Sequence, residues 1–199
     1  GLELFSGGLL GSLGVGAITK QFQEFEDKLL FLSTKLLTTQ KDFAEVEKTI
    51  RQLGRTTSFT SSEVADGATV LAQAGFKAAE VIGLLLPTLD LARGGQVTLE
   101  QSGAILTNTM RSFGIETAKA GEVASQFIAA SRLGTLEVLD LKESIKEVLG
   151  TVRNLNIDLP TTLGLLTQLA ERSLKGTKAG TSLNTALLQL ASKGKELAK

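Results

Sequence analysis

Apolar residues recur at alternating three- and four-residue spacing along residues 20–55, which is the clearest pattern in the chain. This spacing puts them on one face of an α-helix, as at the a and d positions of a coiled coil. Because neither proline nor glycine interrupts the run before Gly54, the pattern predicts one helix of about 34 residues and roughly 50 Å. The stripe consists of Phe22, Phe25, Leu29, Leu32, Leu36, Phe43, Val46, Ile50 and Leu53, with Thr39 as its one polar member.

Two arrangements would bury this stripe: a coiled coil between identical chains, or a core helix within one chain. The flanking charges do not choose between them, and we expect oligomerisation through the stripe. Leu30, Phe31 and Leu37 widen the apolar face, which favours more than two helices in the contact. Aromatic and β-branched residues mixed with leucine at a and d favour a trimer over a dimer, with a hexamer as the alternative.

Residues 56–199 are helical throughout on the same criterion, and no β-like alternation of four or more residues occurs there. Thr60 and Glu63 have the spacing of a capping box, which predicts a helix start. Pro87 and Pro160 are placed near helix starts or bends. The predicted fold is therefore all-α, with a long N-terminal heptad helix followed by a multi-helix bundle of stacked helical hairpins.

The chain nearly repeats itself at intervals of about 40 residues, the period of stacked helical hairpins. Gly75, Gly114 and Asn156 are each followed by one hydrophobic residue, and each residue type tolerates the left-handed conformation that ends a helix. A second kind of turn lies between them, around Gly94-Gly95, Gly134 and Gly176. Since only three copies exist, a compact orthogonal bundle and an open solenoid both remain open.

The first 19 residues differ in composition from the rest, because no charged residue occurs between Leu4 and Thr19. The segment is too short for a transmembrane helix, which needs about 20 apolar residues. Small residues recur four positions apart, which suits a membrane-seeking or tightly self-packing helix; a flexible apolar run is the alternative. We therefore expect three regions: a Gly-rich apolar segment at 1–19, the heptad helix at 20–55 and a helical domain at 56–199.

The sequence lacks His, Cys, Trp and Tyr, which excludes histidine- or cysteine-dependent nucleophiles and His/Cys zinc sites. Lys and Arg together number 21, as do Asp and Glu, so no net field attracts nucleic acid. We expect no enzymatic activity, no catalytic residue, no cofactor and no metal. The single methionine, Met110, lies inside the chain, so we expect the sequence to be part of a longer protein.

Two segments superficially suggest chemistry. Gly176–Leu183 is glycine-rich, but it lacks the Gly-Lys-Ser/Thr ending of a phosphate loop, so we interpret it as small residues that allow close helix approach. Four carboxylates follow one helix face at three- and four-residue steps, and a solvated acidic face is favoured over a carboxylate pair for glycoside cleavage. They are Glu137, Asp140, Glu143 and Glu147.

An ordered set of short motifs over about residues 45–190 resembles the conserved region of phage tail tape measure proteins. The set runs from Thr57-Ser58-Phe59-Thr60 to the terminal Gly176-Thr177-Lys178-Ala179-Gly180-Thr181-Ser182-Leu183. The sequence departs from the family pattern at Asn154-Leu155-Asn156, where the family often has glycine. The motif residues, expected at turns, are Phe59, Gly75, Phe76, Pro87, Phe113, Gly114, Gly176, Gly180 and Thr181.

The resemblance implies a structural module inside the phage tail tube of the virion, which sets tail length during assembly and is released during genome ejection. It implies homo-oligomerisation and contact with tail tube, baseplate or tail-tip proteins, without specific nucleic-acid binding. The alternative is a membrane-active helical protein that uses residues 1–19 as an insertion segment. A transient membrane contact by residues 1–19 is compatible with both interpretations.

Overall fold

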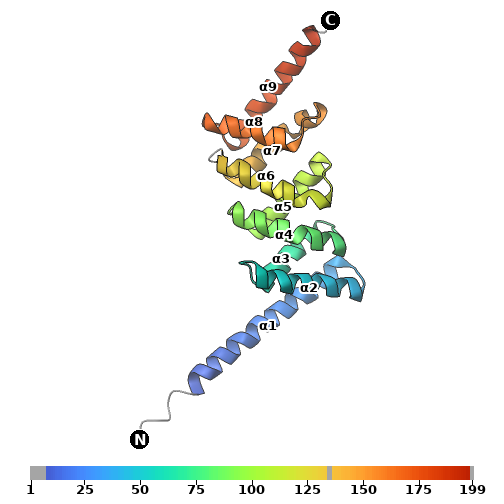
Figure 1. The fold of residues 1–199 in the computed structure, drawn as a ribbon, viewed down its shortest axis with the longest axis vertical. Coiled ribbons are helices and arrows are strands. Elements are labelled where there is room, and N and C mark those ends of the chain that lie inside the picture. Colours follow the sequence, from blue (N-terminus) through green and yellow to red (C-terminus); the bar gives the residue numbers. More distant parts are fainter. Residues whose placement is uncertain (1–7, 134–135, 198–199) are drawn as a thin grey trace. The chain divides into compact units, whose positions relative to one another are not determined.

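The computed structural model describes residues 8–133 and 136–197 of the chain. Every regular element in these two stretches is a helix, which confirms the predicted all-α fold. The chain forms two compact units, Gly1–Ile82 and Gly83–Lys199, which we call unit 1 and unit 2. Helix α4 (Ala78–Gly94) begins in unit 1 and ends in unit 2 (Figure 1).

Unit 1 is built from α1 (Gly8–Leu36), α2 (Gln40–Thr56) and α3 (Ser61–Gln73). Both α1 and α2 pack on α3, which makes α3 the shared partner of this core (Figure 1). The apolar side chains that α3 buries are mostly small, so the neighbouring helices approach it closely. They are Val64, Ala65, Ala68, Leu71 and Ala72.

The predicted single helix over residues 20–55 is wrong, because one helix ends at Leu36 and the next begins at Gln40. Leu37 has a φ of 43°, in the left-handed region, which turns the chain out of α1. Thr39 then caps α2: its hydroxyl accepts from the Asp42 backbone N–H at 3.2 Å and donates to Asp42 Oδ2 at 2.7 Å. A local threonine cap inside the apolar stripe therefore starts a new helix without any glycine or proline.

The break folds the stripe back on itself, so that its two halves face one core within unit 1. Arg51 of α2 joins the halves, since its Nη2 lies 3.1 Å from Glu26 Oε1 and its guanidinium stacks 4.6 Å from the Phe25 ring centroid. The stripe therefore packs within one chain, as in the second predicted arrangement, but as a hairpin. The buried members are Phe25, Leu29, Leu32, Leu36, Val46, Ile50 and Leu53, whereas Phe43 is half-buried and Phe22 is 59% exposed.

The domain boundary predicted after residue 55 lies inside unit 1, because α3 packs on the two helices before it. Gly54, the predicted helix stop, lies within α2. A Cβ at Gly54 would lie 2.7 Å from the Ser61 backbone nitrogen, so the glycine lets α2 approach the start of α3. Of the predicted 1–19 segment, residues 8–19 form the first turns of α1, and residues 1–7 lie outside the described residues.

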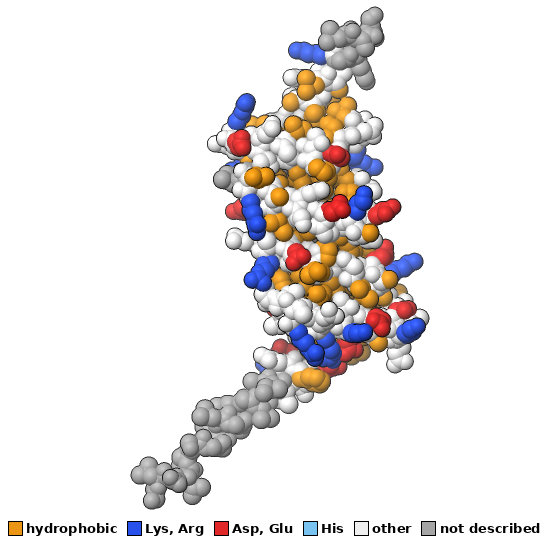
Figure 2. All heavy atoms as spheres, viewed as in Figure 1, with side chains coloured by type: hydrophobic (Ala, Val, Ile, Leu, Met, Phe, Trp, Pro, Cys, Tyr) orange, Lys and Arg blue, Asp and Glu red, His pale blue; other side chains and the backbone are white. Residues whose placement is uncertain are grey.

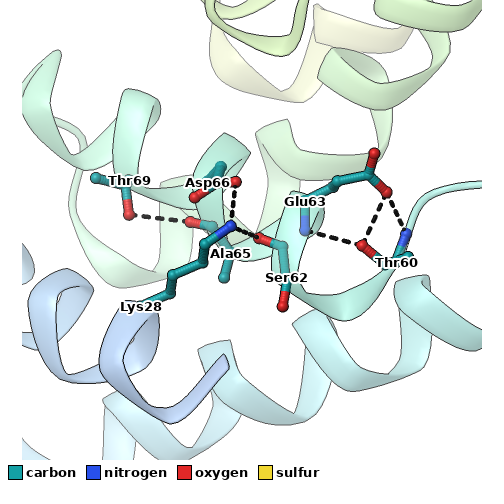
Figure 3. Close-up of polar contacts among 7 residues, drawn as sticks. All are labelled: Lys28, Thr60, Ser62, Glu63, Ala65, Asp66 and Thr69. Atoms are coloured by element: carbon teal, nitrogen blue, oxygen red, sulfur yellow. Dashed lines mark hydrogen bonds and ion pairs between the residues drawn. The ribbon is translucent and has the colours of Figure 1, made fainter. Parts of the chain in front are cut away.

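Polar contacts at the start of α3 fix its position against α1 (Figure 3). Lys28 Nζ of α1 lies 2.6 Å from Asp66 Oδ2. The predicted capping box is confirmed: the Thr60 backbone N–H donates to Glu63 Oε2 at 2.7 Å, and the Glu63 N–H donates to Thr60 Oγ1 at 3.2 Å. The hydrogen bonds from the Thr60 backbone and hydroxyl hold the pKa of Glu63 below its ordinary value.

Unit 2 is a stack of helices in which consecutive helices touch and helices two apart in sequence also pack together. Thus α5 contacts α7, α6 contacts α8 and α7 contacts α9 (Figure 1). This is the arrangement expected of stacked helical hairpins. After α4 the elements are α5 (Leu99–Phe113), a 3₁₀ turn η1 (Thr117–Lys119), α6 (Ala120–Leu133), α7 (Val138–Asn154), α8 (Leu159–Glu171) and α9 (Gly176–Leu197).

The three predicted left-handed helix stops are confirmed, with φ of 89° at Gly75, 66° at Gly114 and 52° at Asn156. The second kind of turn lies where it was predicted at Gly95 and Gly176, and its left-handed residues are Gln96, Ser173 and Gly176. Gly94 and Gly95 are also places of close approach; a Cβ at Gly95 would lie 2.7 Å from Val138 Cγ2. Gly134 lies outside the described residues.

Replacing Thr60 by Ala should lower the free energy of unfolding by about 1 kcal/mol at pH 7, since the α3 N-cap is lost. Because the Glu63 pKa is lower in the folded protein, its stabilisation is complete above the unfolded value of about 4.3 and disappears as pH falls through the lowered pKa. T60A should flatten this acid-side slope in urea unfolding followed by circular dichroism. The exposed neighbour change Ser58→Ala is the control; an equal loss in both variants would refute the cap's role.

Candidate helix-packing site and assembly surface

The family-motif segment Gly176–Leu183 forms the first two turns of α9 and packs on α7. Ala179, Gly180 and Leu183 are buried there. A Cβ at Gly180 would lie 2.8 Å from Glu147 Cβ and 2.9 Å from Ser144 Cα, and closer still to the Ser144 carbonyl oxygen. No side chain fits between the two helices at this point, which confirms the interpretation of this segment as one of close helix approach.

Two hydroxyl groups of α7 hydrogen-bond to α9 along this contact. Ser144, which is 1% exposed, has its Oγ 2.7 Å from the Gly176 carbonyl oxygen and 2.8 Å from that of Asp140 in its own helix. Two turns further on, the Thr151 hydroxyl donates to Asn184 Oδ1. The two contacts advance together along both helices, so α7 and α9 run parallel. At this contact, Gly180 and Ser144 are small enough for the two helices to approach closely. The serine hydroxyl that comes close to α9 is paired with the Gly176 carbonyl oxygen.

Ser144 was not singled out from the sequence, although a signal for it exists. It is a small polar residue on an otherwise apolar face of α7, between the buried residues Leu141 and Val148. Ser102 occupies the corresponding place in α5, is also buried, and donates to the Thr88 carbonyl oxygen at 2.6 Å. The recurrence after 42 residues would have marked both serines as contact points between stacked helices.

The acidic residues of α7 have separate structural surroundings. Asp140 caps the helix, with its Oδ2 accepting from the Glu137 backbone N–H at 3.2 Å. Glu143 forms an ion pair with Lys142 at 3.3 Å, and Glu147 lies beside Gly180. Within residues 8–133 and 136–197, no group of three or more potential metal ligands is gathered. Asp140 thus caps the helix and Glu143 pairs with a neighbouring lysine, and the solvated acidic face favoured from the sequence stays a prediction.

The other motif residues lie at helix boundaries or within helices. Phe59 lies between α2 and α3, Phe76 follows Gly75, and Phe113 ends α5; all three side chains are half-buried. Pro87 and Thr181 lie inside α4 and α9, so the expectation that they mark turns is wrong. Together with the glycines already described, these residues are distributed along the stack and do not form one pocket.

Several large apolar side chains of unit 1 are exposed on α1 and in the turn that follows it. Phe22, Leu30 and Phe31 on α1 are 59%, 68% and 48% exposed, and Leu37 in the turn after the helix is 90% exposed. Elsewhere, basic and acidic side chains are interspersed over the visible face in Figure 2, without a large area of one sign. In the described residues no helix is both long enough and apolar enough to span a bilayer. Membrane contact by residues 1–19 stays a prediction.

Substituting Ala for Gly180 should destabilise unit 2 by about 1–3 kcal/mol, because the added methyl group must push α9 away from α7. Gly164 offers a matched control in α8: it is exposed and a Cβ there meets no atom within 4 Å. Gly164→Ala should therefore raise stability by about 0.5–1 kcal/mol through helix propensity alone. Chemical unfolding of both variants compares them directly; stabilisation by both would show that α9 does not pack closely on α7.

Comparison with known proteins links this stack of helices to phage tails. The chain is 28% identical over 183 residues to "Tape measure protein" of Pneumococcus phage Dp-1, covering 92% of this chain and 16% of that protein. It is 21% identical over 149 residues to "Probable tape measure protein" of Escherichia phage P2, covering 75% of this chain and 18% of that protein. The chain thus spans less than a fifth of the length of either relative.

No solved structure matches the chain. Residues 47–199, which include α3 to α9 and the Gly180 contact, match the family described as "Phage-related minor tail protein". This match and the two relatives confirm the resemblance to a tape measure region that the ordered motifs predicted. The chain belongs to the phage-related minor tail protein family.

Proposed function

We propose that the chain is a structural module of a tail tape measure protein, lying in the lumen of the tail tube. In this proposal its parent protein sets tail length during assembly and leaves the tube during genome ejection. The observation that carries the proposal is the family match over residues 47–199, which covers the whole repeated part of the chain. The proposed role is mechanical and requires no catalysis.

The surface and the core support this proposal in different ways. The core is made by helix packing alone, with paired polar groups at the α7/α9 contact. The net charge is zero and charges of both signs are interspersed (Figure 2), which suits a chain that must later leave a tube without holding its wall or the DNA tightly. Its proposed partners are tail tube, baseplate or tail-tip proteins and further copies of the chain, with a trimer favoured and a hexamer as the alternative.

The repeat allows a length test within the virion that carries this chain. An in-frame deletion of residues 115–156 would remove α6 and α7 and join Gly114 to Ile157, which keeps a left-handed residue followed by an apolar one. Ser102 of α5 would then meet α9 in place of Ser144, because the two serines are 42 residues apart. The deletion therefore shortens the chain while preserving its packing rules.

We expect tails of the deletion phage to be uniformly shorter when measured by electron microscopy. If the hairpins stay stacked in the tail, one layer accounts for about 10 Å; if the segment is drawn out as a single helix, the loss is roughly 60 Å. Gly164→Ala, which keeps the chain length, serves as the control and should leave tails unchanged. Tails of normal length from the deletion phage would contradict a role of this segment in length determination.

A further inference from the structure

A groove on unit 2 brings together the ends of two helices that occupy corresponding places in successive repeats. Helix α5 ends at Phe113, next to the left-handed Gly114, and α7 ends at Asn154, shortly before the left-handed Asn156. Both helix stops line one groove of about 650 Å³, together with residues from the starts of α6 and α8. The motif segment around Gly114 and its counterpart 42 residues later therefore share one surface.

The floor of this groove is apolar. Ile115 and Ile157, which follow the two left-handed stops, are both half-buried. Val123 of α6 and Leu159 of α8 also line the groove and are 2% and 1% exposed. An apolar side chain laid on the two isoleucines would remove their remaining surface from water, which favours binding.

The exposed part of the lining is mainly basic. Arg111, Lys119 and Arg153 all line the groove and are exposed. Among the residues that the structure describes, neither Lys119 nor Arg153 has an ion-pair partner. Asp158 also lines the groove, but its carboxylate accepts the Thr161 backbone N–H at 2.9 Å and so caps α8. With Glu122 as the other acidic residue of the lining, the balance of charge favours an acidic partner.

Gln126 of α6 adds a polar group without a partner. Its Oε1 atom is buried, and no donor in the described part of the chain reaches it. A buried acceptor of this kind costs free energy until it is paired. Because Gln126 lines the groove, a backbone N–H of a bound peptide would supply the donor after a rotation of the side-chain amide.

We propose that this groove binds an acidic peptide segment of a partner protein. An apolar side chain of the segment lies on the two isoleucines, and its carboxylates pair with Lys119 and Arg153. A nucleic-acid backbone suits the groove less well, because its continuous phosphates would also meet the carboxylates of Glu122 and Asp158. A peptide places its acidic residues only where the basic groups lie. The inference rests on the proposed function, since it assigns a contact with tail proteins to unit 2.

Nuclear magnetic resonance of the 199-residue chain, with labelled isoleucine methyl groups, tests the proposal. The probe is a six-residue peptide in which two leucines are flanked on each side by two glutamates. Its addition should shift the signals of Ile115 and Ile157 until they saturate. K119Q/R153Q should weaken this binding by roughly tenfold, because two exposed ion pairs are lost. The circular dichroism of this variant should stay unchanged, since both side chains are exposed.

R93Q/R132Q is the matched control. It also removes two exposed basic side chains of unit 2, but neither arginine lines the groove. It should therefore bind the probe as the natural chain does. K119R/R153K, which keeps both positive charges in the groove, should also bind normally.

The chemistry of the occupant has its own readout. A peptide with glutamine in place of every glutamate should not bind the natural chain, and this comparison holds even if K119Q/R153Q alters folding. The proposal is overturned by unchanged isoleucine signals, by equal binding of the two peptides, or by K119Q/R153Q binding as tightly as the natural chain. A thymidine oligonucleotide that shifts the same signals at a lower concentration than the probe would also overturn it. Shorter tails from the 115–156 deletion would leave the proposed function standing in any of these cases.

Discussion

The structure depends on pairs of helices that approach until no side chain fits between them. At Gly180 the α9 backbone meets Ser144 of α7, and at Gly54 the end of α2 meets Ser61 of α3. Such contacts bring long apolar faces together, and burial of those faces supplies the main stabilising free energy. The penalty of close approach is the desolvation of backbone carbonyls, which hydroxyl donors such as Ser144 offset.

This way of building a fold suits the structural role that we propose. Three hydroxyl groups of unit 2 serve helix contacts: Ser144 and Thr151 donate to α9, and Ser102 donates to the Thr88 carbonyl oxygen of α4. Each stacked layer repeats the same physical solution, so length is varied by whole hairpins without changing the packing. In the proposed role, function in a tail follows from length and from the exposed surfaces of the stack.

The sequence predicted the features that local chemistry controls. Left-handed stops at Gly114 and Asn156 follow from residue type and spacing, and the Thr60 cap follows from its partner three residues later. Helix continuity was mispredicted, because heptad spacing says which residues share a face and not whether one helix carries them all. The break at Leu37 uses a leucine with positive φ, which composition gives no reason to expect. The sequence also did not predict which residues Gly180 contacts, because those contacts depend on how α9 is aligned along α7 in the folded chain.

The central claim is that the apolar stripe closes within one chain as a hairpin between α1 and α2. Its most direct test is the distance between spin labels on Cys introduced at the exposed residues Gln23 and Gln52, in a chain that has no cysteine of its own. Dilution with unlabelled chain removes distances between copies. A hairpin predicts a distance typical of neighbouring helices, on the order of 10–20 Å. A distance of roughly 44 Å, expected for one unbroken helix, would contradict the account.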